Sequence, residues 1–419
     1  APRHIIEQRV GKQAILDTAF DAVADKAFAD ALKEQDMTPV SRPDIEAVTL
    51  EEGKDVVFKA RYGMEVVFEV LRELRGGGSV VTQLMTCCTA VDPIVAAGLV
   101  PHYGELSERT FALDPAKLPL ASDLRAVVLQ HSFGRKGDCH LADAAHAAGA
   151  VLVEDSAHCL ARLSRGNEGE PLADVSVHSF GVQKMVQTYF GGAVWVNPDM
   201  RDRVFKDELS RRLSSLPEMP RHLGRAARSY AWQIRVFMRL PGPLRRAFAA
   251  MQNFEQPIVD AERAGKLPYE PMAADEGVSQ RASWALEGLG KVETTHRASV
   301  ESYRRELASQ GALRYVEIPA AALEGEAQPL LRMPVVMGSQ AKAQRALSAL
   351  RGRGIYAQDW YRPVLYPGVG DPVAYHFDGD LRPWPVCERI VAGILNLPCD
   401  GDPGQVRETI GCLLDVAQS

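Results

Sequence analysis

The spacing of apolar positions changes several times along this chain, and the changes predict where helices and strands lie. Beyond about residue 60, short runs of β-branched and other apolar residues alternate with stretches in which apolar residues recur every three or four positions. The first pattern is typical of buried strands and the second of amphipathic helices. A chain that alternates in this way folds into a mostly parallel sheet with helices on both faces. We therefore predict an α/β fold.

The elements expected between residues 61 and 200 are short. The predicted helices are residues 62–75, 94–98 and 139–148. The predicted strands are residues 79–84, 100–103, 125–130, 150–154, 175–179 and 192–197. Parallel sheets bind their ligands at the carboxyl ends of the strands, so we expect a binding site at that edge. Apolar residues expected to face the core from the first helix are Val66, Val67, Val70, Leu71 and Leu74.

The sequence after residue 200 predicts a helical stretch and then a smaller unit. Residues 201–278 are helical in pattern and rich in arginine, which is typical of a solvated helical face or of a groove for an anionic substrate. We expect a large domain at residues 61–280 and a small α+β domain at residues 281–419. The segments expected in the small domain are a long helix over about 279–310, segments 331–337, 341–351 and 355–358, and a final helix 403–417.

The first sixty residues differ from the rest in charge and in pattern. They carry five Lys and three Arg against twelve Asp and Glu, so −4 of the net charge of −6 lies there. Helical spacing predicts an amphipathic helix over about residues 12–34. Weak alternation over residues 44–60 predicts a strand pair with a turn at Glu52-Gly53. We expect residues 1–60 to form an appended α+β segment.

Composition excludes several classes of protein. Of the 419 residues, 46% are apolar and 24% charged, which favours one large core or two ordinary ones over intrinsic disorder. A net charge of −6 gives no general attraction to nucleic acid. No apolar stretch of about 18 residues and no signal segment is evident, so we predict no membrane association and expect a cytoplasmic location. The seven cysteines lack the paired spacing of zinc sites, so reduced thiols and no metal are expected.

The run Gly76-Gly77-Gly78-Ser79 could suggest a phosphate-binding loop. That device needs a strand before it and a helix after it, so that the helix N-terminus faces the anion. Here the predicted helix comes first and the strand second. We therefore expect these glycines to end the helix and to turn the chain into the strand.

The residues most informative about chemistry lie between positions 153 and 192. Asp155 ends a continuous apolar strand, where an ionised carboxylate is costly unless it meets a cation, such as a protonated pyridine nitrogen. Ser179 and Lys184 lie five residues apart in the loop that leaves another buried strand, so a hydroxyl and an amine can reach the same pocket mouth. A partly desolvated lysine at that edge is the residue type that forms a Schiff base with an aldehyde. Each residue alone is more often structural, whereas the order Asp, then Ser-Phe-x-x-x-Lys, then Gly-Gly is specific.

At these residues the sequence resembles the DegT/DnrJ/EryC1/StrS family of pyridoxal-phosphate (PLP) aminotransferases, the sugar aminotransferases of fold type I. The similarity extends from about Arg61 to the C-terminus. It rests on "VEDSAH" and "SFGVQK", on "HSFG" at residues 131–134, on "LLRMPVV" at residues 330–336 and on "CERIVAGILNLPC" at residues 387–399. The resemblance implies a PLP-dependent transferase fold of type I with a smaller C-terminal α+β domain.

The resemblance also implies roles for individual residues. Lys184 would form the Schiff base with PLP and then move a proton, and Asp155 would pair with the pyridine nitrogen. Ser179 would bind the cofactor phosphate, together with the helix N-terminus at Gly63 and Met64. The expected catalytic residues are therefore Lys184 and Asp155.

Four parts of the sequence depart from the family pattern. His158 stands where the family commonly has Gln near the ring hydroxyl of the cofactor, and either side chain can donate a hydrogen bond there. Residues 1–60 replace the family's segment before the phosphate-binding turn. A Gly-x-Asn-x-Arg pattern is not evident in residues 221–240, and "WYRPVLYPG" at residues 360–368 matches loosely. The departures concern the substrate more than the fold or the cofactor.

Residues 1–60 resemble the N-terminal, ribosome-binding domain of the chaperone trigger factor. The similarity is carried by "APRHIIEQRVGKQAILDTAF", "KAFADALKEQDMTPVSRPDIE" and "TLEEGKDVVFKA". The ribosome-docking signature of that family, Gly-Phe-Arg-x-Gly-Lys, is not present in this sequence. We therefore expect neither chaperone activity nor ribosome association.

These observations predict an aminotransferase that moves an amino group from glutamate to a keto sugar, linked to a nucleotide, and that acts as a homodimer. Three alternatives stay open. The first is a PLP-dependent sugar dehydratase, although such relatives replace the Schiff-base lysine, typically by His. The second is a catalytically impaired protein with the same fold. The third is a chaperone-like, ribosome-associated protein that acts through residues 1–60.

Overall fold

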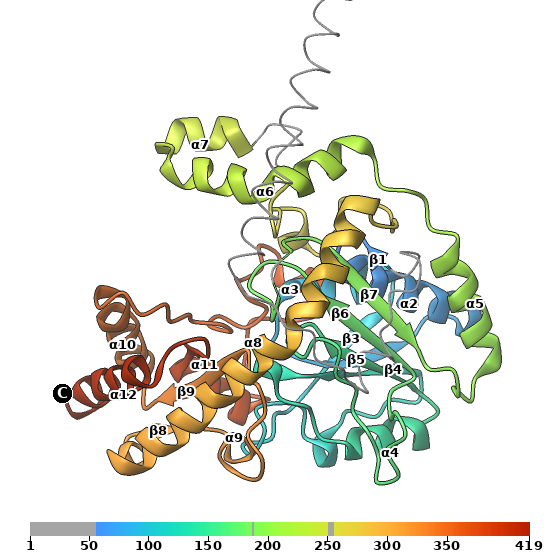
Figure 1. The fold of residues 1–419 in the computed structure, drawn as a ribbon. Coiled ribbons are helices and arrows are strands. Elements are labelled where there is room, and N and C mark those ends of the chain that lie inside the picture. Colours follow the sequence, from blue (N-terminus) through green and yellow to red (C-terminus); the bar gives the residue numbers. More distant parts are fainter. Residues whose placement is uncertain (1–55, 187, 250–254) are drawn as a thin grey trace, which may run out of the picture.

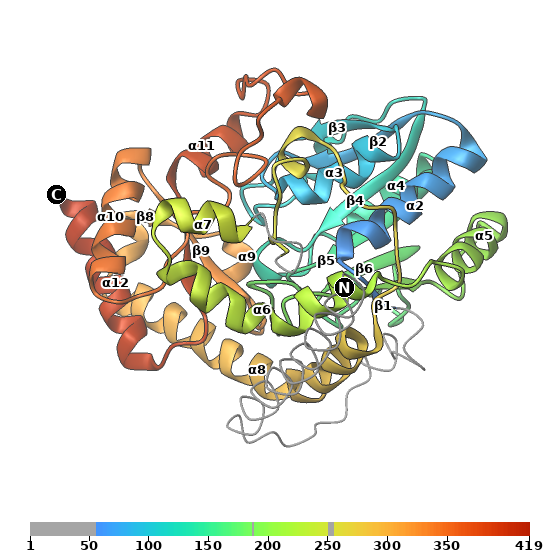
Figure 2. The ribbon, with the colours of Figure 1, turned by 90° about the horizontal axis from the view of Figure 1, so that it is seen from above.

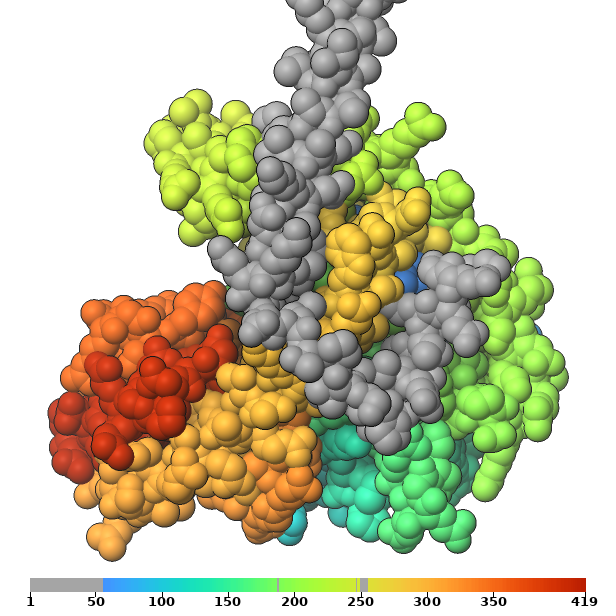
Figure 3. Space-filling view, viewed as in Figure 1, coloured from blue at the N-terminus to red at the C-terminus, as the bar shows by residue number. Residues whose placement is uncertain are grey.

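The structure, a computed structural model, describes residues 56–186, 188–249 and 255–419. Figure 1 shows a large unit built around one sheet and a smaller C-terminal unit, with the long helix α8 (Glu276–Ser309) running between them. In the space-filling view of Figure 3, the orange and red residues of the small unit form a lobe beside the green and cyan surface of the large unit. The predicted α/β fold with a smaller C-terminal unit is confirmed.

A seven-stranded sheet forms the centre of the large unit. Its strands lie in the order β1-β7-β6-β5-β4-β2-β3. The strand pairs from β3 to β6 are parallel, whereas β7 runs antiparallel to both β6 and β1. The prediction of a mostly parallel sheet is therefore confirmed. The strands are β1 (Val56–Val57), β2 (Ser79–Gln83), β3 (Val100–Gly104), β4 (Leu124–Gln130), β5 (Val151–Ser156), β6 (Val175–Ser179) and β7 (Gly192–Val196).

Helices cover both faces of this sheet, because successive side chains of each strand point to opposite sides. From β4, Ala126 and Val128 pack in the cluster that includes α2, α3 and α8, whereas Val127 and Leu129 pack against α4. This two-sided burial explains why the strands are continuously apolar. The helices of the large unit are α2 (Ala60–Arg75), α3 (Cys88–Ala96), α4 (His140–Ala147), α5 (Arg203–Ser214), α6 (Arg221–Arg239) and α7 (Gly242–Ala249).

Helix α2 confirms one prediction and corrects another. Gly76 follows its last residue with a φ of 74°, and its N–H donates to the carbonyl of Arg72. The glycine run is therefore a helix end, as predicted. Leu74, however, was expected to face the core and is 42% exposed. The prediction is wrong because the buried face of α2 ends at Leu71, and the last turn extends past the residues on which it packs.

The small unit has its own sheet and core. Three antiparallel strands lie in the order β10-β9-β8, and the core beneath them includes residues of α10 and α12. Figures 1 and 2 both show α10 and α12 on the side of this unit that faces away from the large unit. Its elements are β8 (Val316–Glu317), α9 (Ala320–Leu323), β9 (Arg332–Met337), α10 (Gln340–Gly352), α11 (Pro385–Gly393), β10 (Ile394–Pro398) and α12 (Pro403–Gln418).

Helix α8 belongs to both units. Ala282 and Leu289 in its first half pack in the core of the large unit, and Val300 and Tyr303 in its second half pack in the core of the small unit. The division expected between residues 280 and 281 falls within the first turns of this continuous helix. By packing alone, the change from one core to the other lies nearer to residue 300.

Two expectations for the small unit differ from the structure. Helix α11 and the edge strand β10 carry no separate prediction from apolar spacing. Residues 355–358, expected as an element, form no strand, and only Gln358 pairs in a single bridge with Asn396.

The elements predicted at residues 12–34 and 44–55 lie outside the described residues. The end of the second one, Val56 and Val57, forms β1 and pairs with β7. The stretch of chain after residue 200 is helical as expected, since it forms α5, α6 and α7. Among the described residues, no helix has both the length and the apolar character that a membrane crossing requires.

Candidate active site

A cavity of about 370 Å³ lies at the carboxyl ends of the parallel strands. Strand β4 contributes Gln130 to its wall, β5 contributes Asp155 and β6 contributes Ser179. The wall is completed by the start of α2, the loop before α3, the loop after β6 and residues 360–366. No described residue of α5, α6 or α7 lines it. The described residues of the arginine-rich helices therefore form no anion groove in the cavity of their own chain.

Asp155 is buried near the carboxyl end of β5, where it lines the cavity. Its Oδ1 accepts a hydrogen bond from the backbone N–H of Ala157 at 3.0 Å. Burial raises the pKa of Asp155, while the Ala157 N–H and the positive charge of Lys184 act in the opposite direction. A cation in the cavity would stabilise a carboxylate in this position, and the expectation that a protonated pyridine nitrogen is that cation stays a prediction.

Lys184 lies on the same cavity, in the loop between β6 and β7. The base of this loop is closed by hydrogen bonds, because Phe180 N donates to Gly191 O at 3.0 Å and Thr188 N donates to Phe180 O at 3.1 Å. Burial lowers the pKa of Lys184, against the effect of Asp155. A lysine with a lowered pKa has a larger neutral fraction, and the neutral amine is the nucleophile.

The predicted phosphate-binding residues are partly brought together. The Ser179 hydroxyl accepts the N–H of Gly181 at 3.3 Å and lies on the cavity wall, where Met64 also lies. Gly63 is not in the wall. A side chain at Gly63 would meet Val194 Cγ2 at 2.5 Å, so this glycine allows α2 to pack closely on β7. The other contributions of α2 to the wall are its first residues, Ala60 and Arg61.

Two buried ion pairs hold the start of α2 beside the cavity. Lys59 Nζ lies 2.5 Å from Glu255 Oε1, and Arg61 pairs with Glu262 and also donates to Pro257 O at 2.8 Å. The acidic partners come from a segment almost two hundred residues later. Their effect is to join the helix N-terminus to the segment that contributes Pro257 and Ile258 to the wall.

His158, predicted near the cofactor ring, lies in a group of aromatic side chains. Its ring centroid is 5.5 Å from that of Trp360 and 6.4 Å from that of Tyr361, and all three residues line the cavity. Burial, followed by the charges of Lys184 and Arg332, lowers the pKa of His158 well below its usual value. The imidazole is therefore neutral at physiological pH.

His131, a residue of the cavity wall, forms a buried pair with Glu154, which lies behind the wall. His131 Nδ1 accepts the N–H of Gly137 at 2.9 Å, and its Nε2 lies 2.7 Å from Glu154 Oε1. The same carboxylate oxygen accepts the N–H of Ser164 at 2.7 Å. Burial alone would raise the pKa of Glu154, but His131 and these hydrogen bonds lower it to about 2. The pair fixes the chain on both sides of Asp155.

Cys87, which the sequence reasoning did not assign, also lines the cavity. It precedes α3, and its Sγ accepts a hydrogen bond from Thr89 Oγ1 at 3.0 Å. Hydrogen bonds from the Cys88 thiol and from Thr89 lower the pKa of Cys87 despite its burial. All seven cysteines lie within the described residues and are free, and five of them are buried, as expected.

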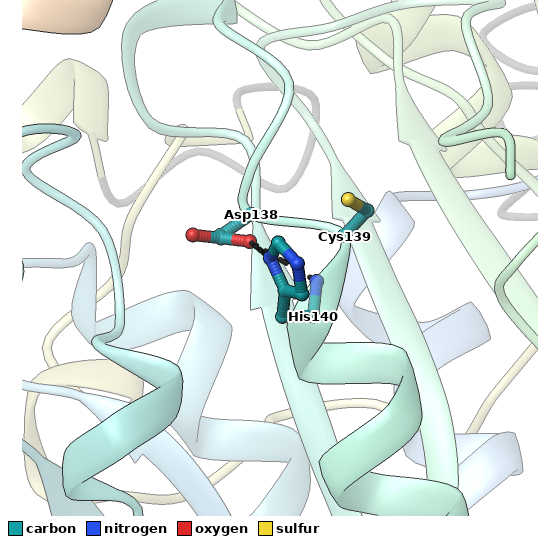
Figure 4. A group of neighbouring side chains, drawn as sticks. All are labelled: Asp138, Cys139 and His140. Atoms are coloured by element: carbon teal, nitrogen blue, oxygen red, sulfur yellow. Dashed lines mark hydrogen bonds and ion pairs between the residues drawn. The ribbon is translucent and has the colours of Figure 1, made fainter. Parts of the chain in front are cut away.

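A separate group of possible metal ligands lies at the start of α4. Figure 4 shows Asp138, Cys139 and His140, with the His140 ring turned toward the Asp138 carboxylate. His140 Nδ1 is 2.7 Å from Asp138 Oδ1, and Cys139 and His140 are exposed. The three residues are consecutive and do not line the cavity, so nothing connects them with the chemistry at Lys184.

The residues found from the sequence and those missed differ in where they lie along the chain. Asp155, Ser179 and Lys184 follow adjacent strands, and their order in the chain is itself a signal. Trp360 and Tyr361 come from the small unit and reach the cavity only through tertiary packing. Their one signal was the loosely matching segment at residues 360–368.

Two family models match this chain. Residues 1–75 match the model described as bacterial trigger factor protein, and residues 60–207 match the model of the DegT/DnrJ/EryC1/StrS aminotransferase family. The two matches overlap in α2. The trigger factor of Moorella thermoacetica is 43% identical over 61 residues, which are 15% of this chain and 14% of that protein. The chain thus covers a small part of the length of these relatives.

Solved structures resemble this chain over most of its length. A putative sugar aminotransferase from Streptococcus pneumoniae, in its PMP form, has a TM-score of 0.64 at 17% identity, covering 94% of this chain and 96% of that one. The Helicobacter pylori aminotransferase PseC has a TM-score of 0.63 at 15% identity with the same coverage. The aminotransferase TlmJ from Streptoalloteichus hindustanus has a TM-score of 0.61 at 20% identity, covering 94% and 97%. At such identities the likeness establishes the fold.

These matches confirm both resemblances read from the sequence, and the predicted fold of type I. The match of residues 60–207 to a family of aminotransferases agrees with the predicted class, a PLP-dependent aminotransferase. The roles of Lys184, Asp155, His158, Ser179, Gly63 and Met64 stay predictions.

Proposed function

We propose that the protein uses PLP to transfer an amino group from glutamate to a keto sugar, linked to a nucleotide. The premise is the match of residues 60–207 to the model of the DegT/DnrJ/EryC1/StrS aminotransferase family. The observation that carries the proposal is that Asp155 and Lys184 line the same cavity, at the carboxyl ends of β5 and β6.

The described residues fit PLP at each part of that molecule. Asp155 offers a buried carboxylate to a protonated ring nitrogen, and Lys184 offers an amine of lowered pKa to the aldehyde. The start of α2 and the Ser179 hydroxyl offer N–H and O–H donors to the phosphate. The positive charges of Lys59 and Arg61 lie at the same end, although each is paired with a glutamate. The fit supports PLP as the cofactor.

The chemistry follows from these positions. When bound, PLP supplies an electron sink that stabilises negative charge at the α-carbon of the amino acid. Asp155, held ionised by the cation beside it, keeps the ring nitrogen protonated. Lys184 Nζ can remove the proton from the substrate α-carbon and would deliver it to the carbon that was the aldehyde carbon of the cofactor. The neutral His158 can donate one hydrogen bond to a ring oxygen without adding positive charge.

The substrates are proposed from the names of the structural neighbours. PseC is described as involved in the biosynthesis of pseudoaminic acid, and the neighbour DesI was solved with its TDP-sugar product. Both descriptions are consistent with a keto sugar as amino acceptor. Nothing favours a dehydratase, whose relatives replace the lysine that is present here as Lys184.

The test separates the two halves of the reaction. Protein loaded with PLP is mixed with glutamate, glutamine, aspartate or alanine, and conversion of the cofactor to its amine form is followed by absorbance together with release of the oxo acid. We expect conversion with glutamate, followed by recovery of the aldehyde form when a nucleotide-linked keto sugar is added. Lys184→Ala should show no conversion. Failure of all four amino acids with the wild-type protein would overturn the proposal.

We also propose that the protein acts as a homodimer, since relatives with this fold complete each site with residues from the neighbouring subunit. The arginine-rich helices α5 to α7 lie outside the cavity of their own chain and are available for such a contact. Light scattering on the active protein should give twice the mass of 45.8 kDa. A monomer that retains turnover would contradict this. The cytoplasmic location expected from the sequence stays a prediction.

A further inference from the structure

Arg332 has a position that neither the fold nor the proposed chemistry accounts for. It is the first residue of β9 and only 8% exposed. The preceding residue, Leu331, donates its N–H to the carbonyl of Phe133 at 2.8 Å. Phe133 follows β4, so this hydrogen bond ties the start of β9 to the loop at the carboxyl end of the large sheet. Arg332 therefore lies where the small unit meets the large one.

The guanidinium of Arg332 makes no hydrogen bond or ion pair with any residue in the described part of the chain. Its Nε is fully buried without a partner. Such burial is costly, because a guanidinium carries five N–H donors and a permanent charge. Arg162 is equally buried, and its guanidinium donates to the carbonyls of Gly134 and Pro329. Arg162 Nε also lacks a hydrogen bond, but it lies 3.4 Å from Glu293 Oε1, so this guanidinium has protein partners. Arg332 has no such partner among the described residues and thus has donors to offer.

Two aromatic rings hold this guanidinium in place. Its carbon atom Cζ lies 5.5 Å from the ring centroid of Tyr356 and 5.8 Å from that of Trp360. Contacts with ring faces stabilise the cation but leave its in-plane N–H groups free to bind an anion. The guanidinium is therefore oriented before any ligand arrives.

Both rings connect Arg332 with the cavity. Trp360 lines the cavity and lies 5.5 Å, centroid to centroid, from His158. The amide of Gln183, another wall residue, donates to the Tyr356 hydroxyl at 2.8 Å. Gln183 is the residue directly before Lys184. An anion on Arg332 would accordingly lie near the end of the cavity at which the lysine acts.

We propose that Arg332 binds a carboxylate group of the amino donor. The proposal rests on the proposed function and names the group that recognises one of its two substrates. A planar guanidinium binds a carboxylate through two parallel N–H···O hydrogen bonds. A phosphate of a nucleotide-linked sugar offers similar oxygens. It is, however, separated from the reacting carbon by the sugar ring, whereas an amino-acid carboxylate is only a few bonds from the reacting amine.

The test measures binding of glutarate, an unreactive dicarboxylate, to the protein loaded with PLP, by calorimetry. Arg332→Met keeps a long side chain between the two rings but removes the charge, and Arg332→Gln is a second variant that keeps hydrogen-bonding groups. A matched control is Arg304→Met, since Arg304 donates to the carbonyls of Ala322, Glu324 and Gly325. A parallel titration uses UDP in place of glutarate.

We expect both Arg332 variants to bind glutarate about 10- to 100-fold more weakly than the wild type. The concentration of glutamate that gives half-maximal conversion of the cofactor should rise in parallel. Binding of UDP and the absorbance of bound PLP should not change, and Arg304→Met should match the wild type. Wild-type affinity for glutarate in either Arg332 variant would overturn the proposal, and weakened binding of UDP alone would assign Arg332 to the nucleotide. A wild-type protein that bears PLP on Lys184 but does not bind glutarate would also refute it, leaving the proposed function intact.

Discussion

At Asp155, burial and charge oppose each other. Removal from water favours the protonated carboxyl group, whereas a cation in the cavity favours the carboxylate. With Lys184 as the nearby cation, the effect of burial is the larger one, and the pKa of Asp155 is raised. A protonated pyridine nitrogen at hydrogen-bond distance would reverse the balance. In the role that we propose for Asp155 its charge is what matters, so a neutral side chain of the same shape should not replace it.

We predict that Asp155→Asn retains PLP but loses at least about 100-fold in turnover, the size of effect seen when one preorganised electrostatic contact is removed. Cofactor content is measured by absorbance and turnover by oxo-acid release. Asp92→Asn serves as the control, because Asp92 is also buried with a raised pKa but binds Tyr375 away from the cavity. The control should keep near wild-type turnover. If Asp155→Asn does so too, another group supports the ring.

The pair formed by Glu154 and His131 allows a prediction about pH. The pKa of Glu154 is about 2 in the folded protein against an ordinary value of 4.5. Because the folded-state pKa is the lower one, this contribution to stability is complete above about pH 5 and is lost as the pH falls toward 2. A shift of this size corresponds to about 3 kcal/mol.

Glu154→Gln should therefore unfold at lower urea concentration than the wild type at pH 7, and the two proteins should converge as the pH falls from 5 to 2. The exposed Glu326→Gln is the control and should follow the wild type at every pH. Urea midpoints that stay equally far apart across this range would show that Glu154 does not titrate as described.

At the scale of residues, the sequence indicates a site residue when its neighbours along the chain carry the signal. Asp155 and Ser179 end apolar strands, and parallel strand ends meet at one sheet edge, so their proximity could be predicted. Cys87, Trp360 and Arg332 could not be placed in this way. Each comes from a segment whose own pattern is ordinary. Only tertiary packing brings Cys87 and Trp360 to the cavity, and Arg332 next to Trp360.

At the scale of elements, α2 and β7 approach each other so closely that the contact depends on glycine. A side chain at Gly192 would lie 2.4 Å from the Cα atom of Ala60, the first residue of α2. Since that neighbour is backbone, it cannot turn aside as a flexible side chain would. The start of α2 is also where the cofactor phosphate is expected, so the packing of this strand fixes one end of the site.

We predict that Gly192→Ala displaces the start of α2, lowers the melting temperature and weakens PLP binding, with a cost of about 1–3 kcal/mol typical of overpacked positions. Gly77→Ala is the control, because no atom lies within 4 Å of the side chain that it would add. Calorimetry and PLP titration measure both effects. Unchanged PLP affinity in Gly192→Ala would separate this contact from the site.

Among the elements, the helices and strands of the large unit were mostly predicted, since alternation of apolar runs with turn residues marks them. In the small unit, α11 and the edge strand β10 were not predicted. Helix α11 ends at Gly393 and β10 begins at the next residue, with no polar turn residues between them. A side chain at Gly393 would lie 2.0 Å from the carbonyl oxygen of Met337 in β9. The close contact between α11 and β9 requires this glycine, and no periodicity in the sequence indicates that contact.

At the scale of the whole molecule, the cavity lies between two units. The large unit supplies Asp155, Ser179 and Lys184, which we propose bind the cofactor. The small unit supplies Trp360, Tyr361 and, as we propose, the carboxylate-binding Arg332. Helix α8 packs in both cores. A change in the relative position of the units would therefore alter substrate binding more than cofactor binding.

The N-terminal segment gives a further prediction at this scale. Its net charge of −4 opposes contact with ribosomal RNA. We expect no co-sedimentation of the full chain with ribosomes at moderate salt, and no difference when residues 1–55 are deleted. Association that persists at that salt and disappears on deletion would support the chaperone-like alternative.

The central claim is that Lys184 carries PLP at the cavity described here. The most direct measurement is borohydride reduction of the PLP-loaded protein, followed by mass spectrometry of its peptides. We predict a single modified lysine, Lys184, and no modification in Lys184→Ala under the same conditions. A modified lysine elsewhere in the chain, or equal labelling of the variant, would contradict the account.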